Sequence, residues 1–499
     1  MRNIDHFIDG RRVAGTSGRH GDVFDPNSGQ VQAHVALANT AELDRAVQSA
    51  VLAQRGWAKV NPQRRARVMF EFKRLLEVHM DELAALLSSE HGKVHGDSRG
   101  DIQRGLEVIE FACGIPHLLK GEYTQGAGPG IDVYSMRQPL GVVAGITPFN
   151  FPAMIPMWMF GPAIAAGNAF ILKPSERDPS VPLRLAELMI EAGLPEGVLN
   201  VVHGDKDVVE AILKHPQIRA VSFVGSSDIA QSVYALGAQH GKRVQCMGGA
   251  KNHGIVLPDA DLDQAVADIL GAAYGSAGER CMALPVVVPV GEATAQALRE
   301  KLVARIPDLR VGVSSDPQAQ FGPVVTAAHR ARIEQYIQMG VDEGAELVVD
   351  GRGFRLPGHG DGFFLGPSLF DRVTDKMTTY REEIFGPVLQ IVRADSFEQA
   401  LALPSQHQYG NGVTIFTRNG DAAREFAEQV EVGMVGINVP IPVPVAYHSF
   451  GGWKRSGFGD LNQYGQDGVR FFTRTKTVTQ RWPRGGAVAD QSFVIPTMR

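Results

Sequence analysis

The sequence predicts an α/β protein with two doubly wound parallel sheets, and three observations support that fold class. Short apolar runs, each followed by a helical pattern, begin near residue 133. A second series of the same kind begins near residue 254 and continues past residue 416. Strands that alternate with helices form right-handed βαβ units and hence parallel sheets. The length of 499 residues exceeds what one hydrophobic core usually supports, so two or three domains are expected.

The predicted elements follow one another in a regular order. A strand at residues 22–24 precedes a helix that Thr40 would cap and that has Glu42 in its first turn. Apolar residues at helical spacing predict further helices over residues 64–87 and 101–119. Beyond residue 133, strands are expected at residues 141–146, 169–172, 198–202 and 220–224, with helices such as 182–192 and 206–214 between them.

These elements divide the chain into two domains and an arm. Residues 1–120 and 140–250 are expected to form a first, Rossmann-like domain, and residues 251–445 a second. Segments 121–139 and 470–499 are interpreted as strands that project from the body and pair with another subunit. We therefore expect a homo-oligomer, either a dimer or a tetramer.

Composition argues against several classes of partner. The 49 Lys and Arg residues against 54 Asp and Glu residues give a net charge of −5, and the short basic run at 474–484 does not predict a nucleic-acid partner. The apolar stretch 149–166 is interrupted by three prolines and is too short for a membrane helix. The N-terminal residues do not resemble a secretory signal, and the three cysteines have no disulfide or metal-site spacing. We expect a cytoplasmic protein with free thiols and no metal.

Cys281 is the candidate nucleophile. A lone cysteine is more often a small buried side chain than a catalytic one. Here, however, the preceding Gly-Ser-Ala-Gly run at 275–278 can bring backbone N–H groups close to a thiolate. Arg280 adds a positive charge, which would lower the pKa of the thiol. A thiolate at this position could attack an aldehyde carbon and form a thiohemiacetal.

Three other segments follow predicted strand ends, where open α/β sheets bind their ligands. Asn150, in the elbow 148–152, is either a turn former or an amide donor to an oxyanion. Lys173 and Glu176 could bind the hydroxyls of a ribose, although a solvated charged turn is the plainer interpretation. Segment 223–227 ends a strand and opens a helix, whose free N–H groups either suit a pyrophosphate or form an ordinary cap.

Taken together, these segments resemble the aldehyde dehydrogenase superfamily over nearly the whole chain. They occur in the expected order: Pro-Phe-Asn-Phe-Pro at 148–152, Leu-Lys-Pro-Ser-Glu at 172–176, Phe-Val-Gly-Ser at 223–226, Gly-Glu-Arg-Cys at 278–281 and Glu-Glu-Ile-Phe-Gly-Pro at 382–387. The resemblance implies an aldehyde dehydrogenase-like fold with an NAD-binding first domain and a catalytic second domain. It also implies Cys281 as nucleophile, Asn150 as oxyanion donor, and NAD contacts from Thr147, Phe149, Lys173, Glu176, Arg177, Ser226 and Glu383.

The chain departs from the hydrolytic members of that superfamily at one position. Their Glu-Leu-Gly-Gly-Lys motif supplies the base that activates water, whereas the matching stretch here, 247–251, is Met-Gly-Gly-Ala-Lys. Methionine cannot accept a proton, so Met247 removes the usual agent of hydrolysis. The plainer interpretation is that Met247 is a core side chain of a degenerate enzyme. Glu279 is close in sequence, but nothing there requires it to reach the thioester.

Residues 247–253 and 279–284 resemble the CoA-acylating methylmalonate-semialdehyde and malonate-semialdehyde dehydrogenases of valine or inositol catabolism. In that family, CoA instead of water releases the acyl group. Arg104 and Arg280 match the arginines expected there to hold the substrate carboxylate, a task that suits the forked donors of guanidinium. Without this resemblance, Arg104 would be interpreted as an exposed helix charge.

Three functions remain open at this point. The first is NAD-dependent, CoA-acylating oxidation of malonate or methylmalonate semialdehyde, with decarboxylation to acetyl-CoA or propionyl-CoA through a Cys281 thioester. The second is a hydrolytic NAD-dependent dehydrogenase that bypasses Met247 and gives a free acid. The third is an inactive binding protein, against which the intact Cys281, Asn150 and Glu383 argue.

Overall fold

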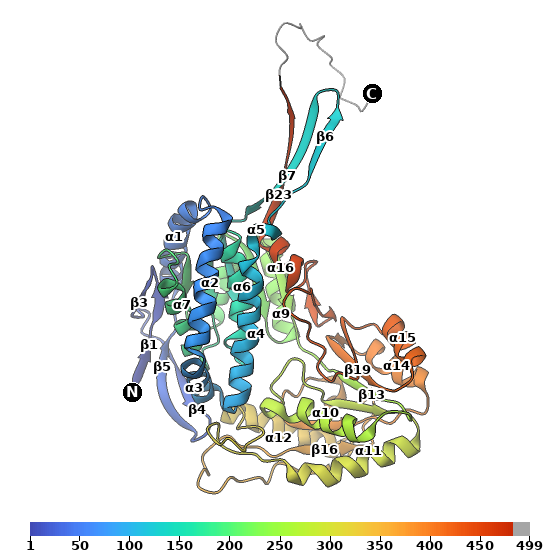
Figure 1. The fold of residues 1–499 in the computed structure, drawn as a ribbon. Helices are drawn as coiled ribbons and strands as arrows, with labels where there is room; N and C mark the ends of the chain where they lie inside the picture. The colour runs from blue at the N-terminus through green and yellow to red at the C-terminus, as the bar shows by residue number, and fades with distance from the viewer. Residues whose placement is uncertain (483–499) are drawn as a thin grey trace.

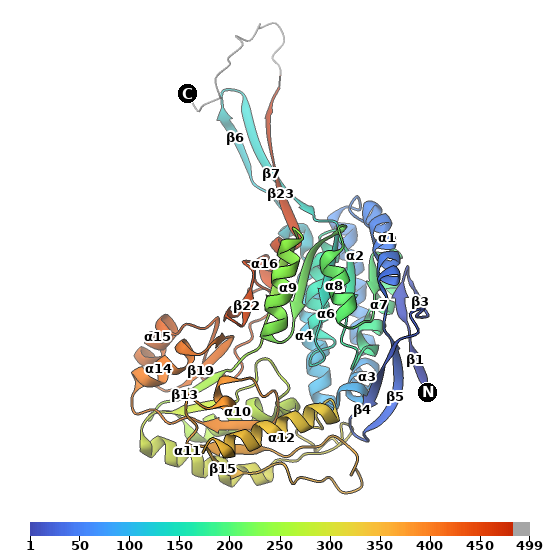
Figure 2. The same ribbon diagram turned by 180° about the vertical axis from the view of Figure 1, so that it is seen from behind.

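The computed structural model describes residues 1–482, which form a body with two large sheets and a slender arm (Figure 1). Figure 2 shows the same chain from behind, with the arm again leading away from the body. The α/β fold class predicted from the sequence is confirmed.

The first sheet has eight strands in the order β22-β12-β11-β8-β9-β10-β2-β3. Its central strands, from β12 to β10, run parallel, and the strands at both edges pair antiparallel. The strands are β2 (His6–Ile8), β3 (Arg11–Val13), β8 (Val142–Ile146), β9 (Ala169–Lys173), β10 (Leu199–Val201), β11 (Ile218–Val224), β12 (Arg243–Met247) and β22 (Gly457–Phe458). Val143 of β8 packs on one face and Ala144 on the other, and both are buried, as is typical of parallel strands.

Helices cover both faces of this sheet (Figures 1 and 2). One face packs against α1 (Thr40–Trp57), α8 (Lys206–Lys214) and α9 (Ser227–Gln239). The other face packs against α6 (Met154–Ala165) and α7 (Ser180–Glu191), with α2 (Pro62–Val78), α3 (Met80–His91) and α4 (His95–Cys113) outside them.

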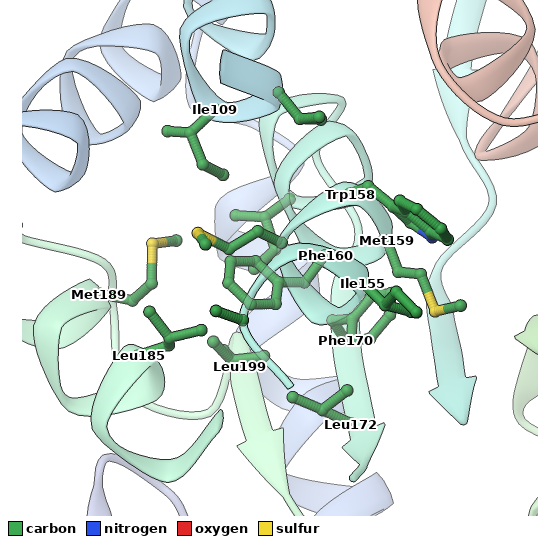
Figure 3. Close-up of a cluster of buried hydrophobic side chains, with 14 of the residues drawn as sticks. Ile109, Ile155, Trp158, Met159, Phe160, Phe170, Leu172, Leu185, Met189 and Leu199 are labelled. Carbon is green, nitrogen blue, oxygen red and sulfur yellow. The ribbon is translucent and has the colours of Figure 1, made fainter. Parts of the chain in front are cut away.

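The largest apolar core surrounds α6, in which every residue is buried. Figure 3 shows Phe160 of this helix among side chains from α4, α7, β9 and β10. The Phe160 ring lies 6.4 Å from that of Phe170 and 6.0 Å from that of Phe72. Because α6 begins just after Asn150, this core also fixes the elbow that carries it. Within residues 1–482, no helix combines the length and apolar character needed to cross a membrane.

The second sheet has seven strands in the order β15-β16-β17-β14-β13-β19-β20, all parallel to their neighbours except β15. They are β13 (His253–Val256), β14 (Val286–Pro289), β15 (Glu346–Val349), β16 (Ser368–Asp371), β17 (Val388–Ile391), β19 (Gly412–Phe416) and β20 (Met434–Ile437). The helices of this region are α10 (Leu262–Tyr274), α11 (Glu292–Arg305), α12 (Ala327–Asp342), α13 (Thr378–Arg381), α14 (Phe397–Gln406) and α15 (Gly420–Gln429).

Shorter elements complete the body. A small sheet joins β1 (Arg2–Ile4), β5 (Gln30–Ala36) and β4 (His20–Asp25), and β18 (Tyr409–Gly410) pairs with β21 (Trp453–Lys454). Two further helices are α5 (Ile115–Leu118) and α16 (Gly465–Phe471). The chain passes from the first sheet to the second after β12 and returns to the first sheet at β22. Two chain connections therefore join the two regions. The domain ranges drawn from the sequence stay a prediction.

The arm is a three-stranded antiparallel sheet of β6 (Tyr123–Gly128), β7 (Ile131–Pro139) and β23 (Thr473–Arg481). Its strands lie within the segments 121–139 and 470–499 that were expected to project. Residues 483–499 of the second segment lie outside the described residues. Pairing of the arm with another subunit stays a prediction.

Three details of the predicted helices are wrong. The helix expected over residues 64–87 is broken at His79 into α2 and α3, although neither proline nor glycine marks the break. The helix expected over 101–119 begins earlier, at His95, and ends at Cys113, before the short α5. The cap of α1 is Asn39 instead of Thr40, because the Asn39 side chain accepts from the Glu42 N–H at 3.0 Å and forms a capping box.

Gly105 allows α4 to lie close to α6. A Cβ there would meet the Met157 side chain and lie 3.1 Å from the Met154 Cα, whereas a Cβ at Gly100 on the same helix would meet nothing. We expect Gly105→Ala to destabilise the fold by about 1–3 kcal/mol through overpacking. Gly100→Ala should instead be neutral or stabilise by up to about 1 kcal/mol through helix propensity. The melting temperatures at one scan rate measure both, and equal shifts would contradict this account.

Candidate active site

A cavity of about 770 Å³ opens at the carboxyl ends of β8, β9 and β11, where it faces segments of the second sheet. Every site residue predicted from the sequence lines it except Arg104 and Arg280: Thr147, Phe149, Asn150, Lys173, Glu176, Arg177, Ser226, Cys281 and Glu383. The position matches the rule that open α/β sheets bind ligands beyond the carboxyl ends of their strands.

Cys281 follows a loop in an unusual backbone conformation. Ser276, Ala277 and Gly278 all have positive φ, at 54°, 52° and 72°, and the first two have side chains that disfavour this region. A side chain at Gly278 would collide with the Gly386 carbonyl. The surrounding structure must therefore hold this loop in place.

Two asparagine side chains hold the end of the loop. The amide nitrogens of Asn252 and Asn411 each donate to the Cys281 carbonyl at 3.0 Å. Asn252 also accepts from the Gly412 N–H at 2.9 Å, which fixes the orientation of its amide. The sequence-based interpretation assigned no role to either asparagine. Asn411 lies 130 residues from Cys281, and no local pattern around it indicates its partner.

The thiol of Cys281 is not activated in the way expected from its neighbour. Loss of solvent and, to a smaller extent, the Glu383 carboxylate raise the pKa of Cys281 to about 11, while Lys93 acts in the opposite direction. Arg280 is not among the groups that shift this pKa, and its guanidinium donates to Asp97 at 2.7 Å. The expectation that Arg280 activates the thiol is wrong.

Asn150 and Thr147 lie on the wall of the same cavity, directly after β8. Asn150 is 3% exposed, in the elbow that precedes α6. The Thr147 backbone is fixed by a hydrogen bond from its N–H to the Lys173 carbonyl at 3.1 Å. Its hydroxyl is buried and has no partner within residues 1–482. A buried hydroxyl without a partner is costly, so a ligand in the cavity would satisfy it.

Lys173 and Glu176 form a charged pair at the end of β9, with the ammonium 3.2 Å from the carboxylate. Loss of solvent alone would raise the pKa of Glu176, but the charge of Lys173 and a backbone hydrogen bond lower it overall. Glu176 is therefore ionised near neutral pH and can accept hydrogen bonds from hydroxyl groups. The Arg177 guanidinium lies 4.9 Å from the centre of the Phe149 ring, a cation–π contact between two residues of this wall.

The N-terminus of α9 opens into the cavity. Ser226 occupies the N-cap position, but its side chain makes no capping hydrogen bond. The first N–H groups of this 13-residue helix can therefore bind an anion. The Ser227 hydroxyl accepts from the Gly249 N–H at 2.9 Å and donates to the Arg455 carbonyl at 2.7 Å, which joins the helix to the loop after β12 and to the turn before β22.

Glu383 comes from the other side of the cavity and lies close to the thiol. It accepts from the Ala250 N–H at 2.9 Å, and a Cβ at Gly249 would lie 2.5 Å from its second oxygen, so glycine leaves room for the carboxylate. Loss of solvent raises the pKa of Glu383 to about 7. The buried ammonium of Lys251 donates to the carbonyls of Thr379 and Glu382, at 2.6 and 2.7 Å, and so fixes the segment that precedes Glu383.

The two side chains considered for water activation are unsuited to it. Met247, at the end of β12, is 9% exposed and packs in the apolar core. Glu279 is fully buried and accepts from the Val325 N–H at 3.1 Å, and burial raises its pKa to about 8. Neither side chain lines the large cavity.

The two predicted substrate arginines both have partners within the protein. Arg104 donates to Glu107 at 3.0 Å and to the carbonyls of Val443 and Pro444 at 3.3 and 2.8 Å. Arg280 pairs with Asp97 and lines a small recess that also includes Cys281 and Glu383. Their role in binding a carboxylate stays a prediction. Within residues 1–482, no group of His, Cys, Asp and Glu side chains could hold a metal ion.

Comparison with known proteins gives matches over most of the chain. The aldehyde dehydrogenase family model matches residues 13–478. The malonate-semialdehyde dehydrogenase of Pseudomonas aeruginosa is 56% identical over 498 residues, covering 100% of both proteins. The mitochondrial acylating methylmalonate-semialdehyde dehydrogenase of Arabidopsis thaliana is 50% identical, covering 96% of this chain and 79% of that protein. A crystal structure from Sinorhizobium meliloti, described as a methylmalonate-semialdehyde dehydrogenase complexed with NAD, is 64% identical, with a TM-score of 0.97 over 97% of this chain and 99% of that one.

Glu383 should control the reactivity of Cys281 above neutral pH. Because the pKa of Glu383 is about 7, its negative charge opposes the thiolate only above that pH. We expect Glu383→Gln to speed alkylation of Cys281 by iodoacetamide at pH 9 by roughly threefold to tenfold, and to leave the rate at pH 6 unchanged. The neighbouring Glu382→Gln is the control, because Glu382 is bound to the Tyr336 hydroxyl and does not shift the thiol's pKa. A Glu383→Gln rate equal to wild type at pH 9 would contradict this prediction.

Proposed function

The chain belongs to the aldehyde dehydrogenase family, and we propose that it is the NAD-dependent, CoA-acylating dehydrogenase of malonate or methylmalonate semialdehyde. The products are acetyl-CoA or propionyl-CoA, CO₂ and NADH. One observation supports the acylating form above all: the cavity holds Cys281, while Met247 stands where hydrolytic relatives carry their base.

NAD fits the cavity by the chemistry of its walls. The first N–H groups of α9 suit a pyrophosphate, and the ionised Glu176 beside Lys173 suits the hydroxyls of a ribose. The partnerless Thr147 hydroxyl and the Glu383 carboxylate provide further contacts. Bound NAD accepts the hydride that leaves the substrate carbon.

Cys281 and Asn150 carry out the first chemical step. The Cys281 thiolate attacks the aldehyde carbon and forms a tetrahedral thiohemiacetal. The Asn150 side chain donates a hydrogen bond to the oxygen that becomes negative. Because both groups lie on rigid segments before the substrate arrives, little reorganisation is needed, and loss of hydride then leaves a thioester on Cys281. The thiolate is disfavoured by the local loss of solvent, so bound ligands must relieve that penalty.

CoA releases the acyl group in the second half of the reaction. Its thiolate attacks the thioester carbonyl, and Cys281 leaves as a thiolate. Decarboxylation is chemically accessible because the carboxylate is β to the thioester carbonyl, which can accept the electrons of the breaking bond. Arg104 and Arg280 bind that carboxylate and orient the aldehyde carbon towards Cys281.

Hydrolysis to a free acid is the alternative. Among the carboxylates that line the cavity, Glu383 is the one whose charge acts on the thiol, and a pKa of about 7 is suitable for a general base. Its hydrogen bond to the Ala250 N–H and its predicted contact with NAD favour a positioning role instead.

The quaternary structure and the location of the protein are also proposed. The arm of β6, β7 and β23 pairs with a second copy in a dimer or tetramer, since its exposed strands have edges available for pairing. The protein acts in the cytoplasm, as its sequence predicts and as its bacterial relatives suggest.

Turnover should depend on CoA. Without CoA we expect a burst of NADH that stops near one equivalent per active Cys281, because Met247 cannot serve as the base that activates water. With CoA and malonate semialdehyde, NADH should form steadily, and mass spectrometry should identify acetyl-CoA. Cys281→Ala is the matched control and should give neither burst nor turnover. Steady NADH production with a free acid as product, in the absence of CoA, would establish the hydrolytic alternative.

Arg104 should select aldehydes that carry a carboxylate. Loss of a charged hydrogen bond typically costs about 1.5–3 kcal/mol. Arg104→Leu should therefore lower kcat/KM for malonate semialdehyde by roughly one to two powers of ten, and change kcat/KM for propanal little. Arg99→Leu on the exposed side of the same helix serves as control. Equal losses for both aldehydes would mean that Arg104 acts only through its bonds to Val443 and Pro444.

A further inference from the structure

Two aspartates on α4 contact the segments that carry Cys281 and Asn150. Asp97 and Asp101 are four residues apart, so they lie on the same face of the helix. Asp101 is fully buried, and Asp97 keeps only 18% of its side chain exposed. Carboxylates are rarely buried without a specific partner, so their contacts require an explanation.

Asp97 holds the loop that carries the nucleophile. Its carboxylate accepts from the Arg280 guanidinium at 2.7 Å, and both side chains are more than four-fifths buried. The same guanidinium lies against the start of the loop, because a Cβ at Gly275 would be 2.6 Å from its nitrogen. Arg280, near the end of the strained segment 275–281, therefore lies against its first residue, and the ion pair with Asp97 anchors the segment to α4.

Asp101 holds the segment that carries the oxyanion donor. Its carboxylate accepts from the Met154 N–H at 2.7 Å, at the first residue of α6 and four residues after Asn150. Lys93 lies between this carboxylate, at 3.6 Å, and the ring of Phe151, whose centre is 3.8 Å from the ammonium. The elbow is thus fixed to α4 from two sides.

We infer that Asp97 and Asp101 are positioning residues, which use α4 as a rigid spacer to set the separation of Cys281 and Asn150. The distance between a nucleophile and an oxyanion donor must be kept within a fraction of an ångström, because a shift of about 1 Å can cost a hundredfold in rate. The two groups come from segments more than a hundred residues apart in sequence, so their separation depends on elements that contact both. The helix α4 is such an element. This inference rests on the proposed roles of Cys281 and Asn150.

The test uses the full-length enzyme with Asp97→Asn, which removes the charge that holds Arg280 and leaves Arg280 itself in place. We expect the rate constant of the NADH burst to fall about tenfold to a hundredfold, while the Kd for NAD stays within twofold. Asp97→Glu keeps the charge on a longer side chain and should recover part of the loss. The control is Asp81→Asn, which breaks an exposed ion pair between Asp81 of α3 and Arg99 of α4.

A second readout needs no substrate and separates this inference from the proposed function. Amide hydrogen exchange should rise in the peptide 275–281 of Asp97→Asn and stay unchanged in the arm peptide 131–139. Unchanged exchange in 275–281 would overturn the inference even if the enzyme turns over semialdehyde. If the variant loses the burst, NAD binding and melting temperature together, or if Asp97→Glu is as slow as Asp97→Asn, the aspartate stabilises the fold generally and the inference is also wrong. If wild type gives no NADH from a semialdehyde, the proposed function fails, and the exchange result still decides the role of Asp97.

Discussion

The hydrogen bonds from Asn252 and Asn411 to the Cys281 carbonyl hold together a loop that would not keep its shape alone. Ser276 and Ala277 have a left-handed backbone that side chains disfavour, and each such residue costs on the order of 1–3 kcal/mol. Strain of this size persists only where the surroundings determine the conformation. The two asparagine hydrogen bonds to the carbonyl and the ion pair of Arg280 with Asp97 provide that determination, and Cys281 lines the cavity.

The electrostatics of the cavity also follow from burial. Loss of solvent raises the pKa of Cys281 to about 11 and that of Glu383 to about 7, and it lowers that of Lys251 to about 7. Each group is thus biased towards its neutral form. A site of this kind avoids the cost of isolated buried charges, and it leaves activation of the thiol to the ligands that enter.

Much of the fold could be predicted because it depends on local patterns. The central strands β8 and β9 are almost continuous apolar runs, since parallel strands bury both faces, and a helix such as α8 shows apolar residues at helical spacing. The break between α2 and α3 could not be predicted. At His79 the chain has no proline or glycine, and apolar residues of both helices pack into the same core, so no local pattern marks the boundary.

The sequence by itself determined which residues lie at the strand ends that form the cavity, because motif and strand boundary coincide there. Asn150 follows β8, Lys173 ends β9, and Ser226 follows β11. It also determined that position 247 carries no base. Only the tertiary structure decided which side chain Arg280 pairs with: its partner Asp97 is 183 residues away, and adjacency to Cys281 suggested a charge acting on the thiol instead. Side-chain direction is set by packing and by distant partners, which a linear pattern of residue types does not contain.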